Sequence, residues 1–159
     1  MTTTKQQDLT TEQALQYAQK YCASLERCPK DVRCKLREKG IEEEQANKII
    51  VKLIKGGYIS EQRYAELYVK SKIHQNHWGR IKIRNMLTSK QIPRNFIQKA
   101  MQNIDEQEYK DILNMLLNKK LNNMTTKDEY QKKYQLKYYL SSHGFEDELI
   151  EEIFKNNNI

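Results

Sequence analysis

The basic side chains between residues 60 and 104 are the residues whose type and spacing suit a chemical task, the binding of an anion. This stretch has nine basic residues against two acidic ones. Arg80 and Arg84 stand four positions apart, so on a helix they share one face and repel each other unless an anion lies between them. Arg84 aligns with Arg33 and Lys137 in the internal repeats of the chain, which predicts a basic stripe. We expect an anion-binding surface, with a face kept basic only for solubility as the alternative, made by Arg33, Lys70, Lys72, Arg80, Lys82, Arg84, Lys90, Arg94 and Lys137.

Aromatic side chains interleaved with lysines are the second candidate, because aromatic rings stack on nucleic-acid bases. The segment concerned contains Tyr130, Lys132, Lys133, Tyr134, Lys137, Tyr138 and Tyr139. Alignment of the repeats places Tyr134 at the position of Ile81 and Tyr139 at the position of Met86, so we predict that both tyrosines are in the core. Tyr138 remains as the exposed candidate contact.

Trp78 is the only tryptophan, and it precedes a glycine between two predicted helices. A lone aromatic residue beside Gly79 is typical of a packed corner, whereas a nucleic-acid platform usually has several aromatic rings. We therefore predict that Trp78 clamps a bend, with stacking on a base as the alternative.

The chain has no motif for catalysis, a cofactor or a metal. His74 and His77 form HxxH without the glutamate of a zinc protease, and there is no phosphate-binding loop or nucleophile elbow. Cys22, Cys28 and Cys34 lack the paired spacing of a structural zinc site, and their odd number favours reduced thiols. We predict a protein that is not an enzyme and holds no cofactor or metal.

Composition indicates an all-α fold. The 159 residues include only five glycines and two prolines, so the turns of a β-rich fold are missing. A charged fraction of 31% and a mean hydropathy of −0.93 leave a thin core. The formal net charge of +7 favours an anionic partner. No long apolar run or signal peptide is recognisable, so we expect a cytoplasmic protein without a membrane contact.

Internal repetition organises the chain. Residues 35–41, 86–92 and 139–145 align at offsets of 51 and 53, and each segment has an apolar residue at its second position. The alignment predicts three sets of core positions: Val32, Ile83 and Leu136; Leu36, Leu87 and Leu140; and Ala46, Ile97 and Ile150.

Each repeat reads as three helices with recognisable ends. Thr10 and Gln13 have the spacing of a capping box, as do Asp105 and Glu108, and Thr126 and Glu129. Pro29 and Pro93 suit the first turn of a helix. We predict three tandem three-helix repeats stacked into an elongated, curved array. The predicted ranges are a flexible tail at 1–9, repeats at 10–59, 60–104 and 105–155, and a tail at 156–159.

The middle of the chain resembles the RecX family of bacterial recombinase regulators. Residues 57–73 read GYISEQRYAELYVKSKI and residues 78–87 read WGRIKIRNML, similar to the family's two conserved segments. The resemblance extends from Ala14 to about Phe154. Arg80 stands where the family commonly has proline, and Gln91 where it commonly has glycine.

The resemblance implies a monomer that binds the RecA filament on single-stranded DNA and restrains its ATP hydrolysis, strand exchange and co-protease activity. It implies no catalytic residues. The alternatives are a stand-alone helical-repeat protein that binds single-stranded nucleic acid, and a scaffold for another acidic protein. The sequence leaves open whether inhibition works by end capping, groove occupation or interference with nucleotide turnover.

Overall fold

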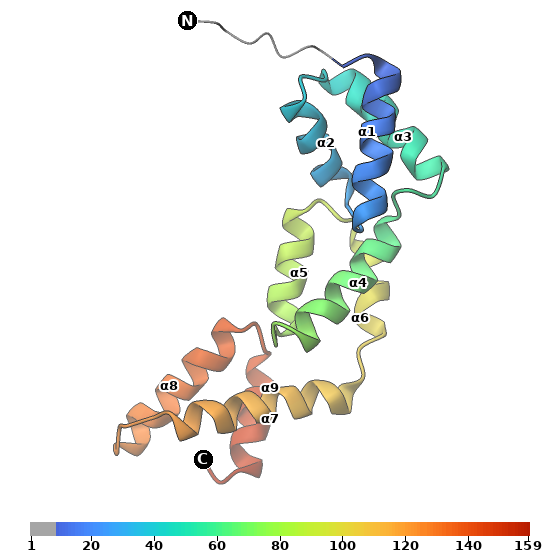
Figure 1. Cartoon of the computed structure of the whole chain (residues 1–159). Helices are drawn as coiled ribbons and strands as arrows, with labels where there is room; N and C mark the ends of the chain where they lie inside the picture. The colour runs from blue at the N-terminus through green and yellow to red at the C-terminus, as the bar shows by residue number, and fades with distance from the viewer. Residues whose placement is uncertain (1–8) are drawn as a thin grey trace, which may run out of the picture. The chain divides into compact units, whose positions relative to one another are not determined.

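The computed structural model describes residues 9–159, and within this range the protein is all-helical. No strand occurs there, which confirms the predicted all-α class. Residues 1–8 of the predicted tail lie outside the described residues. None of the helices that are described is long and apolar enough to cross a membrane. The helices are α1 (Thr11–Ser24), α2 (Pro29–Glu38), α3 (Glu43–Lys55), α4 (Glu61–His74), α5 (Arg80–Ser89), α6 (Arg94–Gln102), α7 (Glu106–Asn122), α8 (Glu129–Ser142) and α9 (Asp147–Asn156) (Figure 1).

The described helices fall into two compact units. The first unit runs up to Tyr64 and includes the short segment Lys90–Ile92, and the second comprises Ala65–Ser89 and Pro93–Ile159. Helices α1 to α3 therefore belong to the first unit, and α5 to α9 with most of α4 belong to the second. The division into three repeats and the elongated, curved array both stay predictions.

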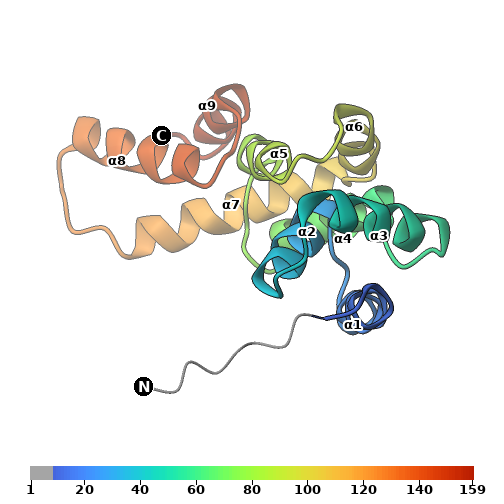
Figure 2. The ribbon, with the colours of Figure 1, turned by 90° about the horizontal axis from the view of Figure 1, so that it is seen from above.

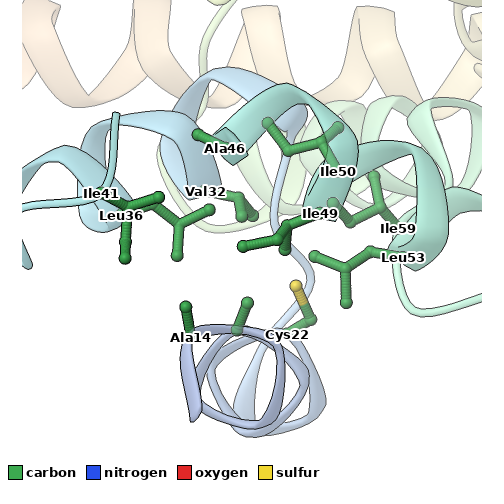
Figure 3. Close-up of a cluster of buried hydrophobic side chains, with 11 residues drawn as sticks. Ala14, Cys22, Val32, Leu36, Ile41, Ala46, Ile49, Ile50, Leu53 and Ile59 are labelled. Atoms are coloured by element: carbon green, nitrogen blue, oxygen red, sulfur yellow. The ribbon is translucent and has the colours of Figure 1, made fainter. Parts of the chain in front are cut away.

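The first unit buries one apolar face of each of its helices. Ala14 and Cys22 of α1 point toward Leu36 of α2 and toward Ile49 and Leu53 of α3 (Figure 3). Apolar residues that recur three and four positions apart lie on one helix face, and burial of that face stabilises the three short helices together.

The second unit is built around α7, which packs against α8 and α9 (Figure 2). Tyr109 of α7 is fully buried, and its ring lies 5.1 Å from the ring of Phe145 between centroids. Leu87 of α5 and Leu140 of α8 are also fully buried. Tyr109 of α7 and Phe145 of the α8–α9 turn thus pack together in the core of the second unit.

The core positions predicted from the repeats are confirmed. Val32, Ile83 and Leu136 each have an exposed fraction of 0%. The other two predicted sets are also buried, and their members are Leu36, Leu87 and Leu140, then Ala46, Ile97 and Ile150.

Three helix starts agree with those predicted from the sequence. Thr10 and Gln13 form the reciprocal capping box, Pro29 is the first residue of α2, and Asp105 caps α7 by accepting a hydrogen bond from the Glu108 amide. Leu9, which we assigned to the tail, packs against the first core.

Two predicted helix starts are wrong by one or two residues. The cap of α8 is Asp128, which accepts from the Gln131 amide, and not Thr126. Both residues are good N-caps, but α8 begins after the second of them. Pro93 is the N-cap of α6 and therefore precedes the first turn that we assigned to it.

Left-handed residues follow α2, α5 and α8 at equivalent positions. Gly40 has a φ of 80°, Gln91 a φ of 59° and Gly144 a φ of 95°. The turn after each of these helices thus has the same handedness, although the middle one is made without glycine.

Candidate functional site

Arg80, predicted as an anion-binding residue, lies in an internal network of the second unit. Its guanidinium forms ion pairs with Glu106 and, at 3.3 Å, with Glu146, and it lies 4.0 Å from the centroid of the Tyr109 ring. The Arg80 amide donates to the Tyr109 hydroxyl at 2.9 Å. That hydroxyl in turn donates to Glu146 Oε2 at 2.8 Å.

These contacts correct the inference that Arg80 and Arg84 need an external anion between them. Only 16% of the Arg80 side chain is exposed, and its counterions are carboxylates at the starts of α7 and α9. Helical spacing reveals partners within one helix, so it could not reveal carboxylates contributed by two others.

The network also shifts the pKa values of its members. The hydrogen bond from Arg80 holds the pKa of the Glu106 carboxyl below its ordinary value, because it favours the ionised form. Burial raises the pKa of the Tyr109 hydroxyl, so the phenol stays protonated and donates to Glu146. The charges are thus fixed in a packed, polar joint.

Two glycines bring the start of α5 against the turn between α8 and α9. The Gly79 amide donates to the His143 carbonyl at 2.7 Å, and the Ile81 amide donates to the Gly144 carbonyl at 3.0 Å. A Cβ atom on Gly79 would lie 2.3 Å from the Gly144 backbone, and one on Gly144 would lie 2.6 Å from the Lys82 amide nitrogen. The amides of Gly79 and Ile81 at the start of α5 are therefore satisfied by the α8–α9 turn of the same unit, and that of Arg80 by the Tyr109 hydroxyl.

Trp78 is half-buried beside this joint, with lysines over its ring. Lys82 Nζ lies 4.4 Å from the ring centroid and Lys72 Nζ lies 4.8 Å from it. The Trp78 amide also donates to the Lys72 carbonyl at 3.0 Å. These contacts support the predicted clamp, because the two lysines occupy the ring that a base would need.

Three other predicted site residues have polar partners inside their own unit. Lys90 pairs with Asp31 at 3.0 Å, Lys137 pairs with Glu151 at 3.0 Å, and Arg33 Nε donates to Asn47 at 3.1 Å. Arg33 also lines a shallow hollow of about 310 Å³ with other basic residues of α2. Arg33 and Lys90 belong to the first unit, and the other predicted cations belong to the second.

Lys70, Arg84 and Arg94 are exposed and form no ion pair with any residue of the described range 9–159. Arg84 lies on the outward face of α5, a helix whose ten residues include no carboxylate. Ile81, three positions earlier on the same helix, is also exposed. An exposed cation on a helix without carboxylates is suited to bind an anionic macromolecule.

The aromatic predictions for α8 are confirmed in one case and wrong in another. Tyr138 is exposed as expected, but Tyr134, predicted as core, has an exposed fraction of 66%. Tyr139 is half-buried, against the ring of His143. The alignment is not at fault, since its equivalent of Tyr134, Ile81, is also exposed. The error was to take an apolar residue at that position as a buried one.

A family model described as the second three-helix domain of RecX matches residues 60–101. The chain is 31% identical over 137 residues to "Regulatory protein RecX" of Clostridium acetobutylicum, covering 81% of this chain and 63% of that protein. It is 24% identical to the protein of the same name from Amycolatopsis mediterranei over 93% of this chain and 87% of that protein.

The solved structures that are similar include the crystal structure of RecX from Lactobacillus salivarius. It has a TM-score of 0.81 and 26% identity, and the match covers 92% of this chain and 95% of that one. The fold defines an all-helical protein, and its helix α5 carries the exposed Arg84 and no carboxylate. The chain belongs to the RecX family of regulatory proteins. It spans about 60% of the length of the clostridial relatives that it matches.

Proposed function

We propose that this protein binds the filament that a RecA-type recombinase forms on single-stranded DNA, and restrains it. The observation that supports this most is the exposed, carboxylate-free face of α5 around Arg84, within the segment that matches the RecX family. Such a partner places the site of action in the cytoplasm.

The contact surface of the proposal is the predicted basic set without Arg80. We place Arg80 outside it because its guanidinium already has two carboxylate partners. Arg84, Lys70 and Arg94 are its exposed members, and they form no ion pair within the described chain. The remaining members are Arg33, Lys72, Lys82, Lys90, Lys137 and Tyr138.

Restraint follows if one monomer attaches to several recombinase protomers at once. Linked contacts raise the effective concentration of each further contact, so binding is strong although each contact is weak. A ligand that binds one state of a filament more tightly than another shifts the filament toward that state. Slower ATP hydrolysis, strand exchange and co-protease activity are the expected consequences, and they require no catalytic residue in this chain.

The direct test is the ATPase activity of RecA on single-stranded DNA. We expect that the protein, added below one molecule per RecA protomer, slows ATP hydrolysis. Unchanged hydrolysis at ratios up to one per protomer would refute the regulatory role.

The competing function is binding to single-stranded nucleic acid without a recombinase. If about four to six phosphates are contacted, the logarithm of the affinity for a bare strand falls with the logarithm of the salt concentration at a slope of roughly 3 to 4. A slope that steep, with no preference for RecA-coated strands, would favour this competitor.

A further inference from the structure

The outward face of α8 carries three tyrosines whose rings have no place in the core of the second unit. Tyr130, Tyr134 and Tyr138 have exposed fractions of 81%, 66% and 71%. We call these three residues the tyrosine stripe. They stand four positions apart, so they follow one helix face with about 6 Å between successive residues along the axis.

The opposite face of the same helix already supplies its packing. Leu136 and Leu140 are fully buried. Helix α8 packs against α7 (Figures 1 and 2). Exposed large aromatic groups cost solubility, and a surface helix normally puts polar residues on its solvent face. The tyrosine stripe is therefore not explained by the stability of α8.

The charges around the tyrosine stripe favour an anionic ligand. Helix α8 has three lysines and a single carboxylate, Glu129 in its first turn. Lys133 is exposed, with its Nζ 5.6 Å from the centroid of the Phe154 ring, and Lys137 is half-buried and pairs with Glu151. The acidic residues of this part of the chain are concentrated on α7 and α9 instead.

We propose that the tyrosine stripe is a stacking platform for the bases of single-stranded nucleic acid, with Lys133 and Lys137 beside the phosphates. Stacking on aromatic rings tolerates any sequence because every base has a π-face. A row of phenol rings with glutamines between them and lysines at the side can stack on bases and pair with phosphates. The row has no aliphatic side chains, which are the groups that a groove on a protein partner would bind. This inference rests on the proposed function in one respect, which is that the proposed function places the chain beside a single strand of DNA.

The test compares variants in binding to a fluorescent oligothymidylate strand and to an abasic strand of the same length. Replacement of all three tyrosines by leucine keeps an apolar surface but removes the rings, and replacement by phenylalanine keeps the rings. Loss of stacking on even one base corresponds to about a fivefold to 150-fold loss of affinity.

We expect the Tyr130→Leu, Tyr134→Leu, Tyr138→Leu variant to bind oligothymidylate at least about fivefold more weakly than the wild type. The triple phenylalanine variant should bind as the wild type does. The wild type should bind the abasic strand no better than the triple leucine variant does. Because the replaced side chains are exposed, both variants should keep the melting temperature of the wild type.

A second readout uses the emission of Tyr134→Trp, compared with the background from Trp78 in the wild type. We expect quenching by oligothymidylate and none by the abasic strand. Equal affinity of the leucine variant and the wild type, or equal binding of both strands, would overturn the proposal and leave a protein surface or a second copy as the occupant. If the protein still slowed RecA ATP hydrolysis in that case, the stacking role of the tyrosine stripe would be refuted and the proposed function would stand. Base-dependent binding without any effect on RecA would refute the recombinase partner and keep the tyrosine stripe.

Discussion

At the scale of single residues, two arginines one helical turn apart have opposite environments. Arg80 is mostly buried between Glu106, Glu146 and the Tyr109 ring, whereas Arg84 is exposed and forms no ion pair in the described chain. The positive charge of Arg80 thus stabilises the fold, whereas that of Arg84, one helical turn later, is available for binding.

Replacement of Arg80 by methionine tests this division. The variant leaves two carboxylates and a phenol without their partner, and we expect a loss of about 2 to 4 kcal/mol in the free energy of unfolding. Arg84→Met is the matched control and should change it by less than about 0.5 kcal/mol. Urea unfolding measures both values, and equal stability of the two variants would contradict the assignment.

The stability difference between the wild type and Arg80→Met should also depend on pH. The pKa of Glu106 is lowered in the folded protein, so its contribution is complete above the ordinary carboxyl pKa and is lost as the pH falls through the lowered value. We therefore expect the two unfolding midpoints to converge below about pH 4.

At the scale of helices, the repeat alignment is tested by neighbouring residues of α5. Leu87 is fully buried and Met86 is partly exposed. We expect Leu87→Ala to lower the free energy of unfolding by about 2 to 5 kcal/mol because it leaves a cavity. Met86→Ala should cost less than about 1 kcal/mol. A stable Leu87→Ala protein in thermal unfolding would refute the alignment that defines the core.

Substitution of two glycines that both have a left-handed backbone tests the close packing between α5 and the α8–α9 turn. Gly144 has a φ of 95° and a close backbone neighbour, whereas Gly57 has a φ of 77° with nothing within 4 Å of an added Cβ. Gly57→Ala should cost about 1 kcal/mol through its left-handed backbone alone. Gly144→Ala should cost about 1 to 3 kcal/mol more, because the Cβ must displace Lys82. Equal losses in chemical unfolding would mean that the joint is not close-packed.

The sequence predicts the helices and their buried faces because both depend on local spacing. Val32, Ile83 and Leu136 are identifiable as core positions since apolar residues at helical spacing recur in all three segments. Two capping residues near one helix start, Thr126 and Asp128, are harder to separate because both are of the types that cap helices.

The surface is less predictable because it depends on contacts between distant segments. The partners of Arg80 lie 26 and 66 residues away. The exposure of Tyr134 follows from which side of α8 packs on α7, and no local pattern of tyrosines and lysines encodes that choice. The i, i+4 spacing of Tyr130, Tyr134 and Tyr138 could have shown that the three share one face, but our alignment placed Tyr134 in the core instead.

At the scale of the whole molecule, the net charge of +7 equals the excess of the second predicted repeat alone. A protein that needed charge only for solubility has no reason to concentrate it in this way, whereas a protein that docks on an anionic polymer has. The proposed partner, a recombinase filament with its DNA strand, offers such a polymer.

The most direct test measures the affinity of the protein for a RecA-coated single strand and for the same strand without RecA, at one salt concentration. We expect the coated strand to bind at least about tenfold more tightly, and Arg84→Glu to lower that affinity by about tenfold or more. Lys119→Glu on the exposed side of α7 makes the same change of charge and should leave the affinity within about twofold. Equal affinity for coated and bare strands, or an Arg84→Glu protein that binds the filament as the wild type does, would contradict the account.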